Sequence, residues 1–149
     1  MGLYSSIEVS ASGLSAQRLA MDVIANNIAN VNTTRTSEGG PFKRQLVVMA
    51  QKNEAAKAQS ANPLDGGDPG AARAGVEVVG IIKDPSADKL IYDPSHPDAD
   101  AQGYVHMPNI EVVKEMVDMM AASRAYEANV TAIQESRQMG AATLGLLRA

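Results

Sequence analysis

Three aspartates and two histidines make up the densest group of side chains that could do chemistry: Asp93, His96, Asp98, Asp100 and His106. Carboxylates and imidazoles bind divalent metals, and a histidine can act as a general acid or base. Two prolines lie among these residues, however, and Asp or Ser before proline is typical of turns. His96 has neither a nucleophile motif nor a paired glutamate beside it. The sequence therefore predicts a rigid turn, with no catalytic residue, metal ligand or cofactor site.

A glycine-rich run at residues 65–70 (Asp-Gly-Gly-Asp-Pro-Gly) is the second candidate, because glycine-rich loops can cradle phosphates. A phosphate-binding loop continues into Lys and Ser or Thr at the start of a helix, and this run does not. It lies within residues 51–74, which are rich in Ala, Gly, Asp and Asn and show no apolar period. We expect a mobile loop over residues 51–74.

The composition excludes several classes of protein. The 149 residues contain no cysteine, which rules out a disulfide scaffold, a thiolate zinc site and a cysteine nucleophile. The net charge of -4 argues against general nucleic-acid binding, which needs clustered Lys and Arg. No apolar run approaches the roughly 18 residues of a membrane span, so we expect no membrane insertion. The N-terminus shows no basic patch followed by an apolar core, so we expect no cleaved secretion signal.

The prolines divide the chain into three parts. All seven lie between Pro41 and Pro108, which leaves two helix-compatible arms around a turn-rich middle. We therefore expect a discontinuous helical domain from residues 1–35 and 109–149, and a small central β and loop segment from residues 36–108. The predicted fold class is mainly α with a small β element.

The first arm predicts an amphipathic helix from about Ser6 to Ala29. Its apolar residues recur every seven positions, at Ile7, Leu14, Met21 and Ile28. At the beginning of this series, Ser5 and Glu8 have the spacing of a capping box, which predicts that the helix starts next to Ser5.

The last arm predicts a longer helix from about Ile110 to Leu147, with Asn109 as its N-cap. Apolar residues again follow a seven-residue period, which is typical of left-handed helix packing. A lone helix cannot bury such a stripe, so each arm needs a partner. We expect the arms to pair within one chain as an antiparallel coiled-coil-like hairpin, and a parallel homo-oligomeric coiled coil is the alternative. The residues expected to pack in the hairpin are Ile7, Leu14, Met21, Ile28, Met116, Met119, Tyr126, Val130, Ile133, Leu144 and Leu147.

The middle of the chain predicts short strands. Residues 41–49 and 75–82 are rich in β-branched residues and bounded by turn signals, and residues 89–92 form a third candidate strand. These strands hold too few apolar residues for a large core of their own.

Four asparagines within seven residues, Asn26, Asn27, Asn30 and Asn32, allow two interpretations. Asparagine is a mediocre helix former, so the run can end the first helix. Amides on one helix face can also bond across a helix–helix contact and fix its register. Arg137 interrupts the apolar period of the second helix and would need a carboxylate partner if buried, for which another molecule is a candidate. The residues expected at a subunit interface are Asn26, Asn27, Asn30, Asn32, Met120, Arg124 and Arg137.

Several segments of the arms resemble the bacterial flagellar rod and hook family. Residues 11–33 are similar to the N-terminal signature of that family, and residues 109–120 and 124–129 are similar to its C-terminal helix. The middle resembles the short-chain proximal-rod members through four motifs, at residues 78–81, 92–94, 96–100 and 103–105. Distal-rod and hook members would carry a larger central β domain.

The resemblance implies a structural axial component of the flagellar basal body, without enzymatic activity or cofactors. It implies partners among copies of the chain itself, other proximal and distal rod proteins, a rod-base adaptor protein and the flagellar type III export apparatus. The chain would leave the cytoplasm by that export route, form the rod in the cell envelope and transmit motor torque across the periplasm. The alternatives are a soluble coiled-coil adaptor that forms a closed oligomer, another rod or hook member, and a metal-dependent enzyme centred on His96.

Overall fold

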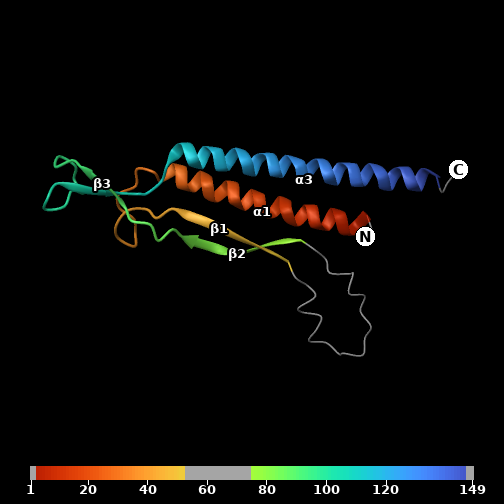
Figure 1. Ribbon diagram of the computed structural model, residues 1–149, viewed down its shortest axis with the longest axis horizontal. Helices are drawn as coiled ribbons and strands as arrows, with labels where there is room; N and C mark the ends of the chain where they lie inside the picture. Colours follow the sequence, from red (N-terminus) through yellow and green to blue (C-terminus); the bar gives the residue numbers. More distant parts are fainter. Residues whose placement is uncertain (1–2, 53–74, 147–149) are drawn as a thin grey trace, which may run out of the picture. The chain divides into compact units, whose positions relative to one another are not determined.

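A computed structural model describes residues 3–52 and 75–146 of the chain (Figure 1). The fold is mainly α with a small antiparallel β element, as the sequence predicts. The helices and strands, in chain order, are α1 (Leu3–Ala29), β1 (Gln45–Gln51), β2 (Val76–Lys83), β3 (Lys89–Tyr92), β4 (Tyr104–Met107) and α3 (Val112–Leu146).

Helix α1 confirms the helix predicted for the first arm and ends at the predicted residue, Ala29. It begins at Leu3, so Ser5 lies inside the helix. The prediction of a capping box at Ser5 is therefore wrong. The first arm contains no proline that would stop the helix. The helix therefore begins at Leu3, two residues before Ser5, where the capping box would have started it.

The asparagine run ends α1, which confirms the first interpretation of these residues. The Asn30 N–H donates to the carbonyl oxygens of Asn26 and Asn27 at 3.1 and 3.2 Å. The Asn30 side-chain amide donates to the Asn26 carbonyl oxygen and to its Oδ1, both at 2.9 Å. Thr33 then donates from Oγ1 to Asn30 Oδ1 at 3.1 Å. The backbone bond to Asn26 still follows the helical i→i−4 pattern, whereas the bond to Asn27 and the side-chain bonds are those of a turn.

Helix α3 confirms the longer helix predicted for the last arm, within two residues at its start. Its first helical hydrogen bond runs from the Glu115 N–H to the Glu111 carbonyl oxygen at 3.0 Å. Glu111 is therefore the N-cap, and the prediction of Asn109 as N-cap is wrong. Leu147 lies outside the described residues.

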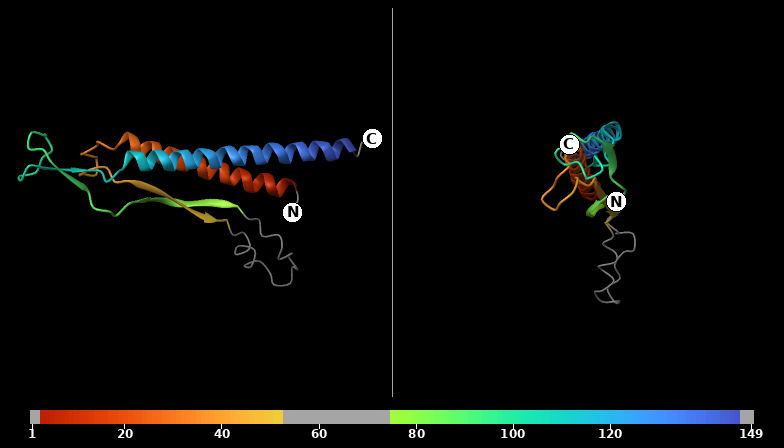
Figure 2. Two further views of the ribbon diagram at one scale, coloured as in Figure 1. Left: turned by 45° about the horizontal axis from the view of Figure 1, so that its top comes forward. Right: turned by 90° about the vertical axis from the view of Figure 1, so that its left-hand side faces the viewer.

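Strands β1 and β2 form a two-stranded sheet, and they lie side by side in the views of Figure 2 as well. Backbone bonds join Asp84 to Arg44 at one end, at 2.8 Å, and Lys52 to Gly75 at the other, at 2.7 Å. This order makes the pair antiparallel. Both predicted strands are confirmed; β1 begins four residues and ends two residues later than predicted, and residues 41–44 are loop.

Strands β3 and β4 form a second antiparallel pair, in which Lys89 lies opposite Met107 and Tyr92 opposite Tyr104. Strand β3 has the predicted bounds, whereas β4 was not predicted from the sequence. The rings of Tyr92 and Tyr104 meet edge to face, with centroids 5.3 Å apart. Gly103, with φ of 83°, turns the chain where a Cβ would lie 3.0 Å from the Tyr92 ring. Glycine is therefore needed at this corner.

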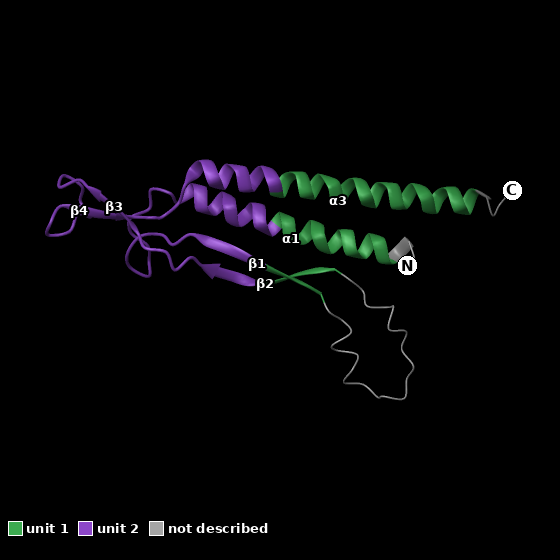
Figure 3. Cartoon of the chain, in the orientation of Figure 1, with its two compact units in different colours: residues 1–18, 49–79, 122–149 green, residues 19–48, 80–121 purple. Residues whose placement is uncertain are grey.

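The chain divides into two compact units, coloured in Figure 3. Unit 1 comprises residues 1–18, 49–79 and 122–149, and unit 2 comprises residues 19–48 and 80–121. The buried residues of unit 1 are Ala16, Ala122 and Ser136, and those of unit 2 are Val23, Asn27, Val105, Pro108 and Glu115. Of the predicted mobile loop 51–74, Gln51 ends β1 and residues 53–74 lie outside the described part.

No helix in the described part of the chain is both long enough and apolar enough to cross a membrane.

Candidate functional site

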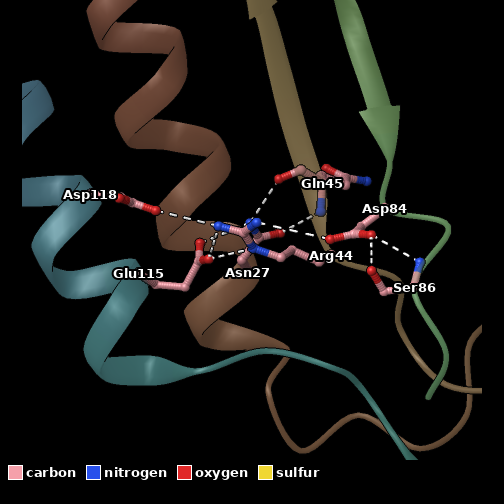
Figure 4. Close-up of polar contacts among 7 residues, drawn as sticks. All are labelled: Asn27, Arg44, Gln45, Asp84, Ser86, Glu115 and Asp118. Atoms are coloured by element: carbon pink, nitrogen blue, oxygen red, sulfur yellow. Dashed lines mark hydrogen bonds and ion pairs between the residues drawn. The ribbon is translucent and has the colours of Figure 1, made fainter. Parts of the chain in front are cut away.

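The two most deeply buried side chains of unit 2 are polar, and they belong to a group of polar side chains drawn from four segments. Figure 4 shows them as one group, which we call the polar cluster: Asn27, Arg44, Gln45, Asp84, Glu115 and Asp118. Glu115 is 0% exposed and Asn27 is 1% exposed. Asn27 comes from α1, Glu115 and Asp118 come from α3, and the other members lie at the ends of β1 and β2.

The Glu115 carboxylate is saturated by partners from the same chain. Arg44 Nε donates to its Oε1 at 2.6 Å, and Arg44 Nη2 forms an ion pair with the same oxygen at 2.6 Å. Asn27 donates from Nδ2 to the other oxygen, Oε2, at 3.0 Å. A buried carboxylate is tolerated only when such charge-assisted bonds replace its water. Arg44 therefore balances the charge of the Glu115 carboxylate, and Asn27 helps to fix its orientation.

Asn27 uses its amide to join α1 to the start of β1. Its Nδ2 donates to the Gln45 carbonyl oxygen at 2.9 Å, and its Oδ1 accepts from the Gln45 N–H at 2.9 Å. The amide thus pairs with a strand residue as a neighbouring strand would. Together with the bond to Glu115, the Asn27 side chain therefore links α1 to both β1 and α3.

Two carboxylates lie at the rim of the cluster. Asp118 Oδ2 accepts from Arg44 Nη2 at 3.3 Å, and Asp84 Oδ2 lies 3.9 Å from Arg44 Nη1. The Ser86 hydroxyl and N–H both donate to Asp84 Oδ1, at 2.5 and 2.9 Å. These bonds, and more weakly the Arg44 charge, lower the pKa of Asp84 below its usual 3.8. Asp84 and Asp118 thus add negative charge around the Arg44 guanidinium.

The cluster has the chemistry of a structural joint. Among the described residues, every buried side-chain nitrogen or oxygen has a hydrogen-bond partner within the chain. The buried polar groups of the cluster are therefore satisfied by one another and by the backbone. Removing one member of such a buried ion pair is strongly destabilising, whereas the intact pair mainly fixes geometry.

Unit 1 joins the same two helices through small, neutral residues. A Cβ on Gly13 would lie 3.1 Å from the Asn129 side chain, so the α1 backbone packs directly against a side chain of α3 at this point. About two turns before Gly13 in α1, Ser6 Oγ lies 3.4 Å from Ser136 Oγ. Ser12 also accepts from the Val76 N–H at 3.0 Å, which attaches β2 to α1. The contact therefore depends on size rather than on charge.

Most residues expected to pack between the helices are half-buried. These are Ile7, Leu14, Met21, Ile28, Met119, Tyr126, Val130 and Ile133. Met116 and Leu144 are exposed instead, at 54% and 64%. The buried positions of α3, Glu115, Ala122 and Ser136, are separated by seven and by fourteen residues. The inward face of α3 thus follows a heptad offset by one position from the one read through Met116.

The residues expected at a subunit interface fall into two groups. Asn26, Asn32, Met120, Arg124 and Arg137 are exposed, and Asn30 is half-buried in the turn after α1. Asn27 is buried within the chain, where it bonds across the contact of α1 with α3.

Sequence reasoning missed Arg44 and Glu115. Glu115 is not singled out by any motif, and Arg44 lies in residues 41–49, which the sequence predicts as a strand. Its heptad position could have located Glu115, because it lies seven residues before Ala122 on the inward face.

Asp93, His96, Asp98 and Asp100 lie in turns, whereas His106 lies in β4. The Ser95 hydroxyl and N–H donate to Asp93 Oδ1, and the Gln102 and Tyr104 N–H groups donate to Asp100 Oδ1. The bonds from Ser95 lower the pKa of Asp93, and the bond from Tyr104 is the largest cause that lowers the pKa of Asp100. Among the described residues, no group of three or more His, Asp or Glu is arranged to hold a metal ion.

The family comparisons match the two helical regions. A family model described as "Flagella basal body rod protein" matches residues 7–35, which contain most of α1. A second model, described as "Flagellar basal body rod FlgEFG protein C-terminal", matches residues 101–146, which contain β4 and α3. These two matches, which cover most of the two-helix fold, place the chain among the rod proteins of the bacterial flagellar basal body.

Full-length relatives narrow the class further. The chain is 49% identical to the flagellar basal-body rod protein FlgC of Borreliella burgdorferi, over 99% of both chains. It is 43% identical to the FlgC protein of Bacillus subtilis, over 93% of this chain and 94% of the relative. The FlgC protein of Escherichia coli is 40% identical over 98% of both. The chain belongs to the FlgC family, and it is a structural component of the proximal rod in the flagellar basal body of the cell envelope.

Proposed function

We propose that this chain builds the rod through its terminal helices, paired as an antiparallel coiled-coil-like hairpin, and that the assembled rod transmits motor torque across the periplasm. Residues 1–35 and 109–149 would form the rod-core domain, and residues 36–108 the central segment. The partners are further copies of the chain, other proximal and distal rod proteins and a rod-base adaptor protein. The flagellar type III export apparatus would deliver the chain, which acts as a structural protein and not as an enzyme.

The register of the helix contacts is the observation that carries this proposal. In unit 1, Ser6 contacts Ser136 and Gly13 contacts Asn129, so seven residues forward in α1 match seven residues backward in α3. In unit 2, Asn27 bonds Glu115, fourteen residues further in each direction along the sequence. Opposite steps of seven are the signature of an antiparallel pair with a heptad period.

The exposed apolar residues of α3 support assembly into a polymer. Val113 is 70% exposed, and Met116, Val117 and Met120 are each 53–54% exposed. Large apolar side chains grouped on one helix face commonly mark a protein interface. A contact between two different faces of identical subunits does not close on itself and builds an open helical filament.

Aspartate substitutions at the helix contact test the proposal. Leu14→Asp or Ile133→Asp should abolish rod assembly while export of the chain persists, because a charge at a half-buried seam position prevents the helices from pairing. Thr143→Asp is the matched control, since Thr143 is exposed and its hydroxyl bonds only within its own helix. Basal bodies are counted by electron microscopy, and the exported chain is measured by immunoblot. Intact basal bodies and normal swimming in Leu14→Asp and Ile133→Asp cells would contradict the proposal.

A further inference from the structure

We propose that neighbouring copies of this chain meet in the rod with the outer face of α3 in one copy against the outer face of α1 in the next. The two helices run antiparallel, and charged residues set a single register. This inference rests on the proposed polymerisation, and it adds which faces meet and which residues lie opposite one another.

Each helix has an outer face of exposed residues spaced by three and four positions. Such spacing places them on one side of a helix. On α1 the outer face comprises Glu8, Ala11, Ser15, Arg18, Asp22, Ala25 and Ala29. On α3 it comprises Val113, Met116, Val117, Met120, Arg124, Glu127, Thr131, Gln134, Arg137 and Gln138.

The charged residues of the two outer faces are complementary in one antiparallel register. Arg18 lies ten residues after Glu8, and Arg137 lies ten residues after Glu127. Aligning Arg18 with Glu127 therefore also aligns Glu8 with Arg137. Within the described residues, no ion pair inside the chain occupies any of these four charges.

A third pair follows from the same alignment. Asp22 is four residues after Arg18, and Arg124 is three residues before Glu127, so these two opposite charges also meet. The register used inside the chain, with Gly13 at Asn129, would instead bring Arg18 to Arg124. Like charges at that spacing repel, so the outer faces require a register of their own.

The apolar residues fit the same register. Val117 and Met120 of one copy would lie against Ala29 and Ala25 of the next, and large side chains against small ones let two helices approach closely. Exposed ion pairs contribute little affinity, so the charges select the register and the apolar residues hold the contact. A second copy is the occupant because both complementary faces belong to this one sequence, as an open polymer requires.

Disulfide trapping in assembled rods tests the register, and the natural absence of cysteine makes it clean. The proposed register places Ser15 opposite Thr131 of the neighbouring copy. A chain with both Ser15→Cys and Thr131→Cys should form disulfide-linked dimers and longer ladders in basal bodies purified after mild oxidation. The matched control carries Ser6→Cys and Ser136→Cys, whose side chains meet inside the chain, so it should give an oxidised monomer.

Charge reversal supplies a second measurement. Arg18→Glu or Glu127→Arg alone should lower the yield of the Ser15–Thr131 cross-link by about two- to fivefold, because each places like charges opposite one another. The double substitution restores the opposite charges and should return the yield to its original level.

The outcomes separate this inference from the proposed function. Ladders in the test chain, with rescue by the double charge reversal, would support the register. Monomers alone in the test chain, with the control oxidised in the same rods, would overturn the register and leave rod assembly through the terminal helices intact. Absence of the wild-type chain from purified basal bodies would instead contradict the proposed function.

Discussion

Helices α1 and α3 contact each other in both units, but the contact chemistry differs. In unit 1 the contact is small and neutral, with Gly13 against Asn129 and alanines buried on both helices. In unit 2 it is charged, with the buried Glu115 held by Arg44 and Asn27. The comparison separates two ways of fixing a helix pair. Close packing sets the distance between helices, whereas a buried polar group accepts only one arrangement of its partners.

The difference also explains how the β element is attached. In unit 1 the Ser12 hydroxyl accepts a hydrogen bond from the Val76 N–H. In unit 2 the Asn27 amide pairs with both the N–H and the carbonyl of Gln45. Arg44, the residue just before β1, bonds to Glu115 of α3. An isolated two-stranded sheet is marginally stable, so it depends on such attachments. The polar cluster therefore anchors the central segment more firmly than the bond at Ser12 does.

The largest effect is expected from removing the buried carboxylate. Glu115→Ala leaves Arg44 largely buried without its main partner, which should lower the free energy of unfolding by about 3–5 kcal/mol. Asp118→Ala is the matched control on the same helix, because its carboxylate is 45% exposed and should cost no more than about 1 kcal/mol. Urea denaturation of the purified full chain, followed by circular dichroism, measures both. If both variants lose the same free energy of unfolding, the buried Glu115 carboxylate does not stabilise the chain more than the exposed Asp118 carboxylate does.

A smaller loss is expected at Asn27. Asn27→Ala leaves the N–H and carbonyl of Gln45 and one oxygen of Glu115 without their partner, which should cost about 2–3 kcal/mol. Asn26→Ala removes only exposed contacts next to it and should cost less than about 1 kcal/mol. Hydrogen exchange at the Gln45 amide adds a local readout, and it should become faster only in Asn27→Ala. If that amide remains equally protected in both variants, Asn27 does not attach β1.

Packing at unit 1 should be the next most sensitive feature. Gly13→Leu forces a side chain against the Asn129 amide, where even a Cβ would lie at 3.1 Å, and should cost about 1–3 kcal/mol. Gly145→Ala is the control, since nothing lies within 4 Å of its Cβ position and alanine favours a helix by up to about 1 kcal/mol. Thermal unfolding of the two variants should therefore shift in opposite directions. A Gly13→Leu chain as stable as the wild type would show that the helices are not in close contact there.

The smallest effect is expected from acid, at the turns around β3 and β4. Bonds from Ser95 and Tyr104 lower the folded-state pKa values of Asp93 and Asp100 below their usual 3.8. Their contribution to stability is therefore present above pH 3.8 and is lost as the pH falls through the lowered pKa values. Hydrogen exchange at Ser95 and Tyr104, measured across that range, should show the turns loosening. The variant with Asp93→Asn and Asp100→Asn should show a flatter dependence, and an unchanged dependence would exclude these two carboxylates as its cause.

The sequence predicted the elements better than it predicted their contacts. The bounds of α1, α3 and β3 follow from proline placement and apolar period, which are local signals. Strand β4 has only four residues, among them His106, and its pairing with β3 is a non-local property that no local period shows. The N-cap assignment at Asn109 failed because several polar residues near Pro108 could begin a helix.

The polar cluster was only half visible in the sequence. The asparagine run suggested an amide that bonds across helices, and Asn27 does so. Its partners could not be predicted, because a Glu in the first turns of a helix ordinarily faces solvent, and because Arg44 lies 71 residues from Glu115 along the chain. A buried ion pair becomes recognisable only once packing has removed its water.

Electron cryomicroscopy of purified basal bodies, at a resolution that shows side chains, tests the central claim most directly. The account predicts that α1 and α3 of one chain are paired antiparallel in the assembled rod, with Gly13 opposite Asn129 and with Glu115 held between Arg44 and Asn27 of the same chain. Density in which α1 of one chain pairs only with α3 of another, with the Glu115 carboxylate away from its own Arg44, would contradict it.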